Sequence, residues 1–321
     1  MRSGGEPGPL APAMTWHTLA PGTPGSPEWS HSGIAVDQAG TVYWADPAGG
    51  AILVQPSAGG PPSRIEVPLL EIHGITYDHR DGREVLWLAD PGFKMRPPRY
   101  EPEARDGSAG CLDLATREFR PLAQPDLPQY AEQPWRPTAV ALGADVVVVA
   151  DGYGASLVHF YHRSGHLRAL DGSDSGTGFR CPHGLAVLGH DLVVADRGNH
   201  RLVLFRLDGA YLRSFTHPRL RSPTGLAVQG NTLVVTDLDG ALLAVDLAGD
   251  RLEEIVPFPA GRKQPGWPNL EREGVTVRPG LTAGTLNSPH GVAVGADGSI
   301  YLTEWVIGGR EIRLTPSVGE G

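Results

Sequence analysis

The stretch CPHGLAVLGHDLVVAD, residues 181–196, contains two short apolar runs that lie between a Pro-His-Gly word and an aspartate. Five other segments share this layout: SHSGIAVDQAGTVYWAD (30–46), EIHGITYDHRDGREVLWLAD (71–90), RPTAVALGADVVVVAD (136–151), SPTGLAVQGNTLVVTD (222–237) and SPHGVAVGADGSIYLTE (288–304). Most copies continue into a third and a fourth apolar run, such as RLVLFRLDG and AYLRSF after Asp196. A repeated four-stranded unit of about forty residues is typical of a β-propeller blade. The sequence therefore predicts an all-β, six-bladed propeller with four-stranded antiparallel blades.

The repeats account for most of the chain. The sixth copy ends one strand short, after EIRLTP (311–316), and TWHTLAP (15–21) can supply the missing strand and close the ring. We expect residues 14–321 to form a single propeller domain and residues 1–13 to be a flexible tail. Two insertions, 91–110 and 259–287, are rich in Gly, Pro and charged residues, which predicts loops.

Composition limits the partners and the compartment. The formal net charge of −9 disfavours binding to nucleic acid or to an anionic membrane. No apolar stretch has the length of a transmembrane helix, and the N-terminus MRSGGEPGPLAPAM lacks the apolar region of a signal peptide. The two cysteines, Cys111 and Cys181, form neither a metal motif nor a disulfide framework. These features predict a cytoplasmic protein whose partners are neither nucleic acids nor membranes, and they do not predict an oligomeric state.

The residue just before the first strand of each copy alternates in type: Ser32, His73, Thr138, His183, Thr224 and His290. Alternate blades of a six-bladed ring lie about 120° apart, so the three histidines should converge at one end of the axis. Three imidazoles can hold zinc, or another divalent transition metal, and leave a fourth position open, which is the arrangement of catalytic sites. The alternative is that duplication simply copied a turn in which each histidine bonds a backbone carbonyl.

For the other residues that recur in the copies, the pattern favours structural roles. The Ser and Thr of the odd copies suit short hydroxyl-to-backbone bonds, and the acids that end the second strands suit capping of the following turn. Two residues of those turns occur in one copy only: Tyr153 in ADGYGAS and Arg197 in ADRGNH. Because the start of strand one and the turn after strand two lie at the same end of the ring, both side chains can lie beside the ion.

These residues resemble a known family. Histidines in three alternate copies, DGY at 151–153 and VADR at 194–197 resemble the peptidyl-α-hydroxyglycine α-amidating lyases, which are NHL-repeat six-bladed propellers. The resemblance is strongest over 147–205 and continues to 288–304. It implies a zinc-dependent lyase that takes a small-molecule or peptide-like substrate and splits an N-(α-hydroxyalkyl) amide into an amide and an aldehyde, glyoxylate in the parent reaction. It also implies zinc ligands at His73, His183 and His290, a base at Tyr153 and an active-site cation at Arg197.

The chain departs from that family at three places. An arginine of the family's first blade is replaced in the turn WADPAGG (44–50), where Asp46 stands, and Lys94, Arg96 or Arg99 of the first insertion can substitute for it. Gly291 stands where the family has an aspartate of a structural calcium site, which leaves Ca²⁺ an open question. Gly154 replaces a disulfide cysteine of the secreted members. These changes point to a different substrate more than to a different metal.

Two other functions remain open. A non-catalytic NHL-repeat scaffold that binds protein or nucleic acid would need no metal. A metal-dependent lactonase of the six-bladed type would need a cage of hard oxygen ligands around calcium, whereas imidazoles prefer softer ions. No G-x-S-x-G motif supports a covalent hydrolase.

Overall fold

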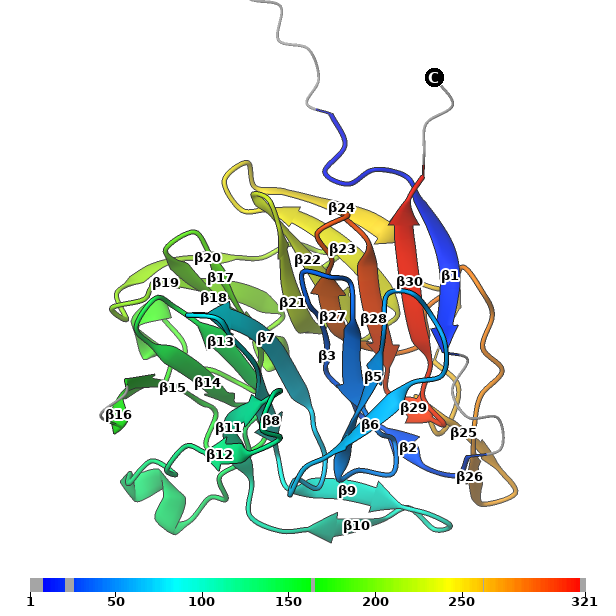
Figure 1. The fold of residues 1–321 in the computed structure, drawn as a ribbon. Helices are drawn as coiled ribbons and strands as arrows, with labels where there is room; N and C mark the ends of the chain where they lie inside the picture. Colours follow the sequence, from blue (N-terminus) through cyan, green and yellow to red (C-terminus); the bar gives the residue numbers. More distant parts are fainter. Residues whose placement is uncertain (1–7, 21–25, 163–164, 262, 318–321) are drawn as a thin grey trace, which may run out of the picture.

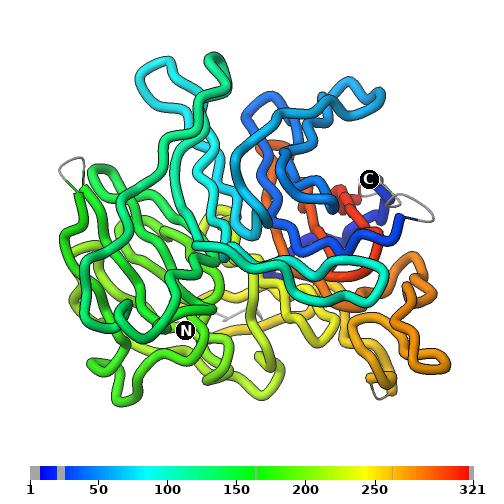
Figure 2. Tube along the Cα trace, turned by 90° about the horizontal axis from the view of Figure 1, so that it is seen from below, coloured from blue at the N-terminus to red at the C-terminus, as the bar shows by residue number. Residues whose placement is uncertain are grey.

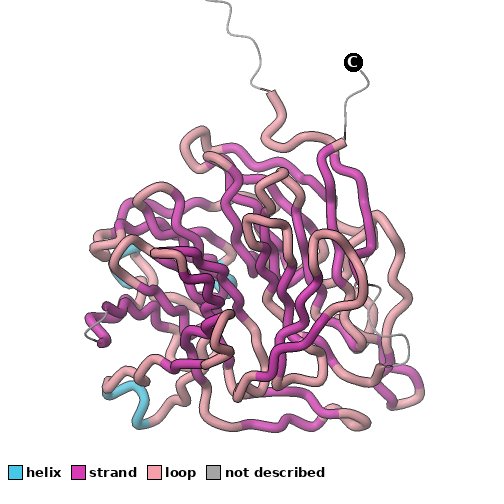
Figure 3. Tube along the Cα trace, in the orientation of Figure 1, coloured by secondary structure: helices cyan, strands magenta, loops and turns pink. Residues whose placement is uncertain are grey.

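The protein is built almost entirely from short strands (Figure 3). The computed structural model describes residues 8–20, 26–162, 165–261 and 263–317. Within these ranges the helices are three 3-10 turns, η1 (Pro128–Ala131), η2 (Ser173–Ser175) and η3 (Arg197–Asn199). None of them is long and apolar enough to cross a membrane.

Six four-stranded antiparallel sheets form the predicted six-bladed propeller. Blades 1 to 3 consist of β3 (Ile34–Val36), β4 (Val42–Ala45), β5 (Ala51–Gln55) and β6 (Ser63–Glu66); β7 (Gly74–Arg80), β8 (Arg83–Asp90), β11 (Ser108–Asp113) and β12 (Phe119–Pro121); and β13 (Ala139–Leu142), β14 (Val147–Asp151), β15 (Leu157–His162) and β16 (Gly165–Leu170). Blades 4 to 6 consist of β17 (Pro182–Leu188), β18 (Asp191–Asp196), β19 (Arg201–Arg206) and β20 (Tyr211–Phe215); β21 (Pro223–Gln229), β22 (Thr232–Asp237), β23 (Ala241–Asp246) and β24 (Arg251–Val256); and β27 (Pro289–Val294), β28 (Ile300–Glu304), β30 (Glu311–Pro316) and β1 (Met14–Ala20).

The ring is closed by the N-terminal segment, as the sequence predicts. Figure 1 shows β1, in blue, lying beside the red β30, and the register runs from Met14 opposite Pro316 to Thr18 opposite Ile312. Blade 6 therefore combines strands from both ends of the chain, and β1 pairs with the edge of β30 that would otherwise be open. Residues 1–7 of the expected tail lie outside the described residues.

The core is divided into six apolar clusters, one between each pair of neighbouring blades. Strand β18 shows why. Its side chains alternate between the two faces of the sheet, so that Leu192 and Val194 pack toward blade 3 while Val193 and Ala195 pack toward blade 5. Because both faces are buried, the second strands read as continuous apolar runs, such as VVVVAD and LVVAD, rather than as an apolar–polar alternation.

Each of the two insertions contains a hairpin that the sequence analysis did not predict. Strands β9 (Phe93–Arg96) and β10 (Glu101–Ala104) pair in the first, and β25 (Leu270–Arg272) and β26 (Val275–Val277) pair in the second. Strand β10 is exposed throughout, so its sequence carries no apolar periodicity that would reveal it. Figure 2, seen from below Figure 1, shows the β9–β10 hairpin lying across one end of the ring. A third short pair, β2 (Trp29–Ser30) with β29 (Val306–Ile307), joins blades 1 and 6.

Candidate metal centre

Glycine follows each of the three predicted histidines because the backbone of the next blade lies against it. A Cβ at Gly184 would stand 2.0 Å from the Thr224 carbonyl oxygen, which is far inside any allowed contact. A Cβ at Gly74 would meet the carbonyl of Thr138 at 2.6 Å, and one at Gly291 the carbonyl of Ser32 at 2.9 Å. The His-Gly word therefore allows each even blade to approach a carbonyl group of the following odd blade.

The same carbonyls orient the histidine rings. His73 Nδ1 lies 2.6 Å from the Thr138 oxygen, His183 Nδ1 lies 3.3 Å from the Thr224 oxygen, and His290 Nδ1 lies 3.0 Å from the Ser32 oxygen. A carbonyl oxygen can only accept a hydrogen bond, so each Nδ1 carries the proton and each Nε2 keeps its lone pair. A metal-binding histidine usually donates its other ring nitrogen to a carbonyl or carboxylate in this way. The alternative from the sequence, a histidine bonded to a backbone carbonyl, is thus found at Nδ1, and it leaves Nε2 available.

The odd-blade hydroxyl groups bond the backbone, as expected. Thr138 Oγ1 donates to the carbonyl oxygens of Ala150 or Pro182, at 3.3 and 3.1 Å, and Thr224 Oγ1 lies 3.0 Å from the Thr236 oxygen. The alternation along the chain therefore has a physical basis. Even blades supply imidazoles, and odd blades supply the carbonyls that orient them.

The structure brings His73, His183 and His290 together at one point. The ring centroids form a triangle with sides of 4.4, 4.7 and 5.0 Å, and all three side chains are buried. The Nε2 atoms of His73 and His290 lie 3.0 Å apart. A cavity of about 60 Å³ borders the three rings on the side of the axial channel.

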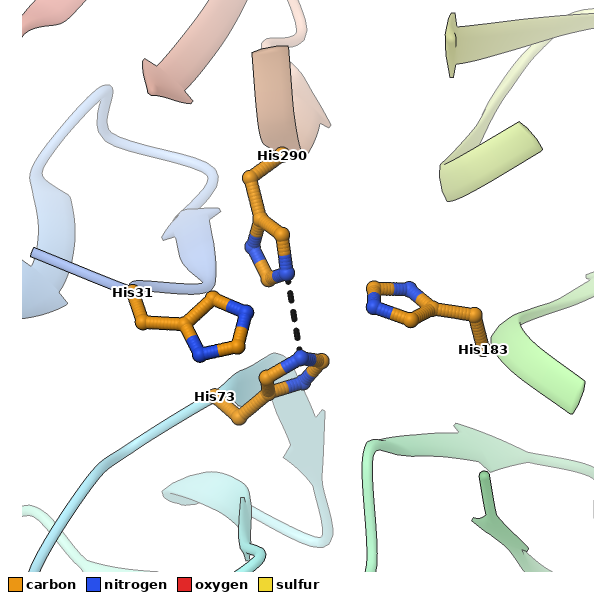
Figure 4. Close-up of side chains that lie close together, drawn as sticks. All are labelled: His31, His73, His183 and His290. Carbon is orange, nitrogen blue, oxygen red and sulfur yellow. Dashed lines mark hydrogen bonds between the residues drawn. The ribbon is translucent and has the colours of Figure 1, made fainter. Parts of the chain in front are cut away.

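A fourth histidine, which the sequence analysis missed, completes the cluster. His31 precedes β3, and its ring lies 4.5 Å from the rings of both His73 and His290 (Figure 4). One ligand atom from each of the four histidines lies within 4.8 Å of all the others, so the cluster can hold a metal ion. No other set of His, Cys, Asp or Glu residues in the described part of the chain has this property. The signal was present in SHSG, where the histidine stands one position before the aligned Ser32.

Electrostatics favour neutral rings that are ready to accept a cation. Burial holds the pKa of His31, His73 and His183 well below the ordinary value of 6.5, and it lowers the pKa of His290 to about 4. The donor set consists of imidazole nitrogens only, which suits zinc, iron, copper or nickel better than calcium. The buried, pre-oriented Nε2 atoms therefore fit a transition-metal ion.

Tyr153 and Arg197, each from the turn after a second strand, lie at the same centre. The Tyr153 hydroxyl oxygen is 3.0 Å from His183 Nε2, 3.3 Å from His73 Nε2 and 3.4 Å from His31 Nε2. Arg197 Nη1 donates to this hydroxyl over 3.4 Å, and its guanidinium lies 5.3 Å from the Tyr153 ring centroid. Burial raises the pKa of Tyr153 to about 12, and the positive charge of Arg197 opposes that rise.

The acids that end the second strands hold these turns in place. Asp151 accepts hydrogen bonds from the amides of Arg136 and Ala155 and from the Tyr130 hydroxyl, which fixes the turn that presents Tyr153. Asp196 accepts from the Arg180 amide and pairs with Arg201 at 2.7 Å, beside Arg197. Their contacts are those of capping groups, in agreement with the structural interpretation.

Of the cations considered as substitutes for a blade-one arginine, Lys94 lies near enough to the cluster for its charge, in addition to burial, to lower the pKa of His31, whereas Arg96 and Arg99 pair with acids of the first insertion. Lys94 is buried and pairs with Glu71 at 3.2 Å, while Arg96 and Arg99 pair with Glu103 and Glu101. In the blade-one turn, Asp46 pairs with Arg64 at 2.9 Å. Blade 1 contributes the imidazole of His31 to the cluster instead of a guanidinium.

The fold and the site thus define a six-bladed β-propeller with a buried cluster of four histidines. The NHL repeat model matches residues 179–205, which include β17 and β18. No curated protein matches the chain.

Among solved structures, the chain is similar to a streptogramin B lyase, with 14% identity, a TM-score of 0.60, and coverage of 95% of this chain and 98% of that one. It is also similar to virginiamycin B lyase from Staphylococcus aureus, with 13% identity, a TM-score of 0.56, and coverage of 94% and 99%. A chain of the nidogen/laminin complex follows with 17% identity, a TM-score of 0.54, and coverage of 80% and 82%. At these identities the likeness shows the fold.

Proposed function

We propose that this protein is a metal-dependent carbon–nitrogen lyase that cleaves an N-(α-hydroxyalkyl) amide to an amide and an aldehyde, with glyoxylate as the aldehyde when the substrate is an N-acyl-α-hydroxyglycine. The observation that carries the proposal is the Tyr153 hydroxyl, which lies within 3.4 Å of Nε2 atoms of three histidines and of the Arg197 guanidinium. The sequence resemblance to amidating lyases involves Tyr153, Arg197 and two of these histidines, His73 and His183, together with His290.

The proposed reaction removes the hydroxyl proton of the substrate, forms the carbonyl of the aldehyde and breaks the C–N bond, whose electron pair and one proton end on the amide nitrogen. Tyr153, as its phenolate, takes up the hydroxyl proton. A divalent ion held by the histidines would supply a Lewis acid that lowers the pKa of that hydroxyl. Arg197 acts on the base, because its positive charge opposes the rise to about 12 that burial causes in the pKa of Tyr153.

The cluster disfavours the two alternatives. A scaffold gains nothing from burying four imidazoles with lowered pKa, because the Tyr153 hydroxyl has a single proton and can donate it to only one of the three Nε2 atoms that it faces. A calcium-dependent lactonase needs carboxylate and amide oxygens around the ion, whereas the cluster consists of histidines alone. Two of the similar solved structures are named lyases, which agrees with a lyase activity in general and specifies neither the bond cleaved nor the substrate.

The test is the release of glyoxylate from a simple N-acyl-α-hydroxyglycine, combined with metal analysis of the purified protein. We expect stoichiometric metal, activity that is lost on exhaustive chelation, and activity that returns when zinc is restored. His183→Ala should lose both metal and activity. His190→Ala is the matched control, because His190 is exposed in the turn at the other end of β17.

Tyr153→Phe separates the base from the metal. The variant should keep the ion and lose at least about 100-fold in kcat, as expected when a general base is removed. Tyr211→Phe, at an exposed tyrosine of β20, is the control for the loss of a hydroxyl group. Full turnover by Tyr153→Phe would exclude the tyrosine from the mechanism, and full activity after chelation would exclude the metal.

A further inference from the structure

We infer that His31 is an exchangeable fourth ligand of the metal centre, which occupies the position that an external ligand must take. The inference rests on metal binding at the proposed centre but not on the lyase reaction. It concerns the one histidine of the cluster that does not belong to the even-blade pattern.

The backbone that carries His31 is firmly held. Trp29 and Ser30 of β2 pair with β29, Lys94 Nζ of the first insertion donates to the Trp29 carbonyl at 3.1 Å, and the Tyr100 hydroxyl donates to the Pro27 carbonyl at 2.9 Å. These contacts tie the His31 segment to blade 6 and to the β9–β10 hairpin. The His31 ring can therefore reach the cluster in a defined position.

The side chain of His31 is held differently from the other three. Each even-blade ring donates Nδ1–H to a carbonyl of the next blade, whereas the hydrogen bond found for the His31 ring among the described residues joins its Nε2 to Tyr153, at 3.4 Å. Beyond that, its ring packs against aromatic rings, including Trp305 at 5.3 Å. A metal-binding histidine is normally fixed by a hydrogen bond from its second nitrogen. His31 lacks a carbonyl partner of this kind within the described ranges.

The ring of His31 lies beside the His73–His290 side of the triangle, 4.5 Å from each of those two rings. Figure 4 shows its ring entering between His290 and His73, opposite His183. In a tetrahedral site with metal–nitrogen bonds of 2.0–2.1 Å, the ligand nitrogens stand about 3.4 Å apart. The four ligand atoms of the cluster, all within 4.8 Å of one another, need only small side-chain shifts to reach that spacing. The arrangement is three fixed imidazoles plus one imidazole free to leave.

Cobalt(II) is the probe, because its visible absorption reports coordination number. We expect apo protein loaded with Co²⁺ to give an intense four-coordinate spectrum, and His31→Ala to give a changed spectrum. Azide, which must displace His31 in the unaltered protein, should bind His31→Ala at least about tenfold more tightly, equivalent to about 1.4 kcal/mol. His73→Ala should lose far more Co²⁺ affinity than His31→Ala, and His190→Ala should match the unaltered protein in every measurement.

Each contrary result is distinct. An unchanged Co²⁺ spectrum and affinity in His31→Ala would remove His31 from the coordination sphere. A changed spectrum with unchanged azide affinity would make it a fixed ligand rather than an exchangeable one. No Co²⁺ binding by the unaltered protein would overturn the metal centre itself, and the lyase proposal with it. If His31→Ala fails to fold, as judged by circular dichroism, His31→Gln provides the same comparison with a side chain of closer size.

Discussion

Replacing Gly184 by alanine tests whether the neighbouring blade's carbonyl orients the metal-binding ring. The new Cβ would stand 2.0 Å from the Thr224 oxygen, whereas real Cβ atoms essentially never come closer than 3.0 Å. The two groups must therefore separate by at least 1.0 Å, the difference between these distances. The hydrogen bond from His183 Nδ1 to the same oxygen is already 3.3 Å long, so a shift of that size breaks it.

Two effects should follow from Gly184→Ala. Overpacking between blades 4 and 5 should cost about 1–3 kcal/mol of the free energy of unfolding. Loss of the orienting carbonyl should weaken metal affinity about 10- to 100-fold, which is the usual effect of removing the hydrogen-bond partner of a metal-binding histidine. The assays are urea unfolding followed by circular dichroism, and competitive titration of zinc against a chromophoric chelator.

Gly280→Ala is the matched control, because a Cβ there meets nothing within 4 Å. It should leave the stability nearly unchanged and the zinc affinity equal to that of the unaltered protein. If Gly184→Ala lost stability as calculated but kept its full zinc affinity, the carbonyl would support the fold without orienting His183, and the reasoning on the alternation of blades would be wrong.

Three further predictions concern charge and metal. Burial raises the pKa of Glu311 to about 8, so the folded protein keeps a proton that the unfolded chain releases near pH 4.5, and stability should fall as the pH rises from 5 to 8. Glu311→Gln should remove about 3 kcal/mol of that difference in urea unfolding at the two pH values, and an equal slope in both proteins would refute the assignment. Chelation should lower the melting temperature of the unaltered protein but not that of His183→Ala, because the ion binds the folded state alone; differential scanning fluorimetry gives both values, and an equal decrease in the two proteins would contradict this. Arg197→Leu should shift the rising limb of the pH–kcat profile to higher pH, since the charge of Arg197 lowers the pKa of Tyr153, whereas Arg197→Lys should keep most of that shift; an unmoved limb in both would show that Arg197 does not act on the base.

The sequence predicted the ring and the convergence of three of the four clustered histidines for definite reasons. The second strands are buried on both faces, so continuous apolar runs such as VVVVAD indicate where they lie. The histidines of the even copies fall at equivalent positions of the repeat. The alignment of the repeats did not identify His31, because this residue stands one position before the aligned one and belongs to an odd copy. The local sequence pattern did not predict strands β9 and β10, because every residue of β10 is exposed. Their pairing also depends on contacts with distant segments, such as the hydrogen bond from Arg96 to the Ala48 carbonyl.

The hydrogen bonds from the histidines of one blade to the carbonyls of the next also limit how the number of repeats can change. Each even-blade imidazole depends on the blade that follows it, and the last dependence, of His290 on Ser32, crosses from the final repeat back to the first. The smallest self-consistent module is therefore a pair of repeats. Gain or loss of a single repeat would set two histidine-bearing units, or two carbonyl-donating ones, side by side, so descendants of this architecture that keep the site should change their repeat number by twos.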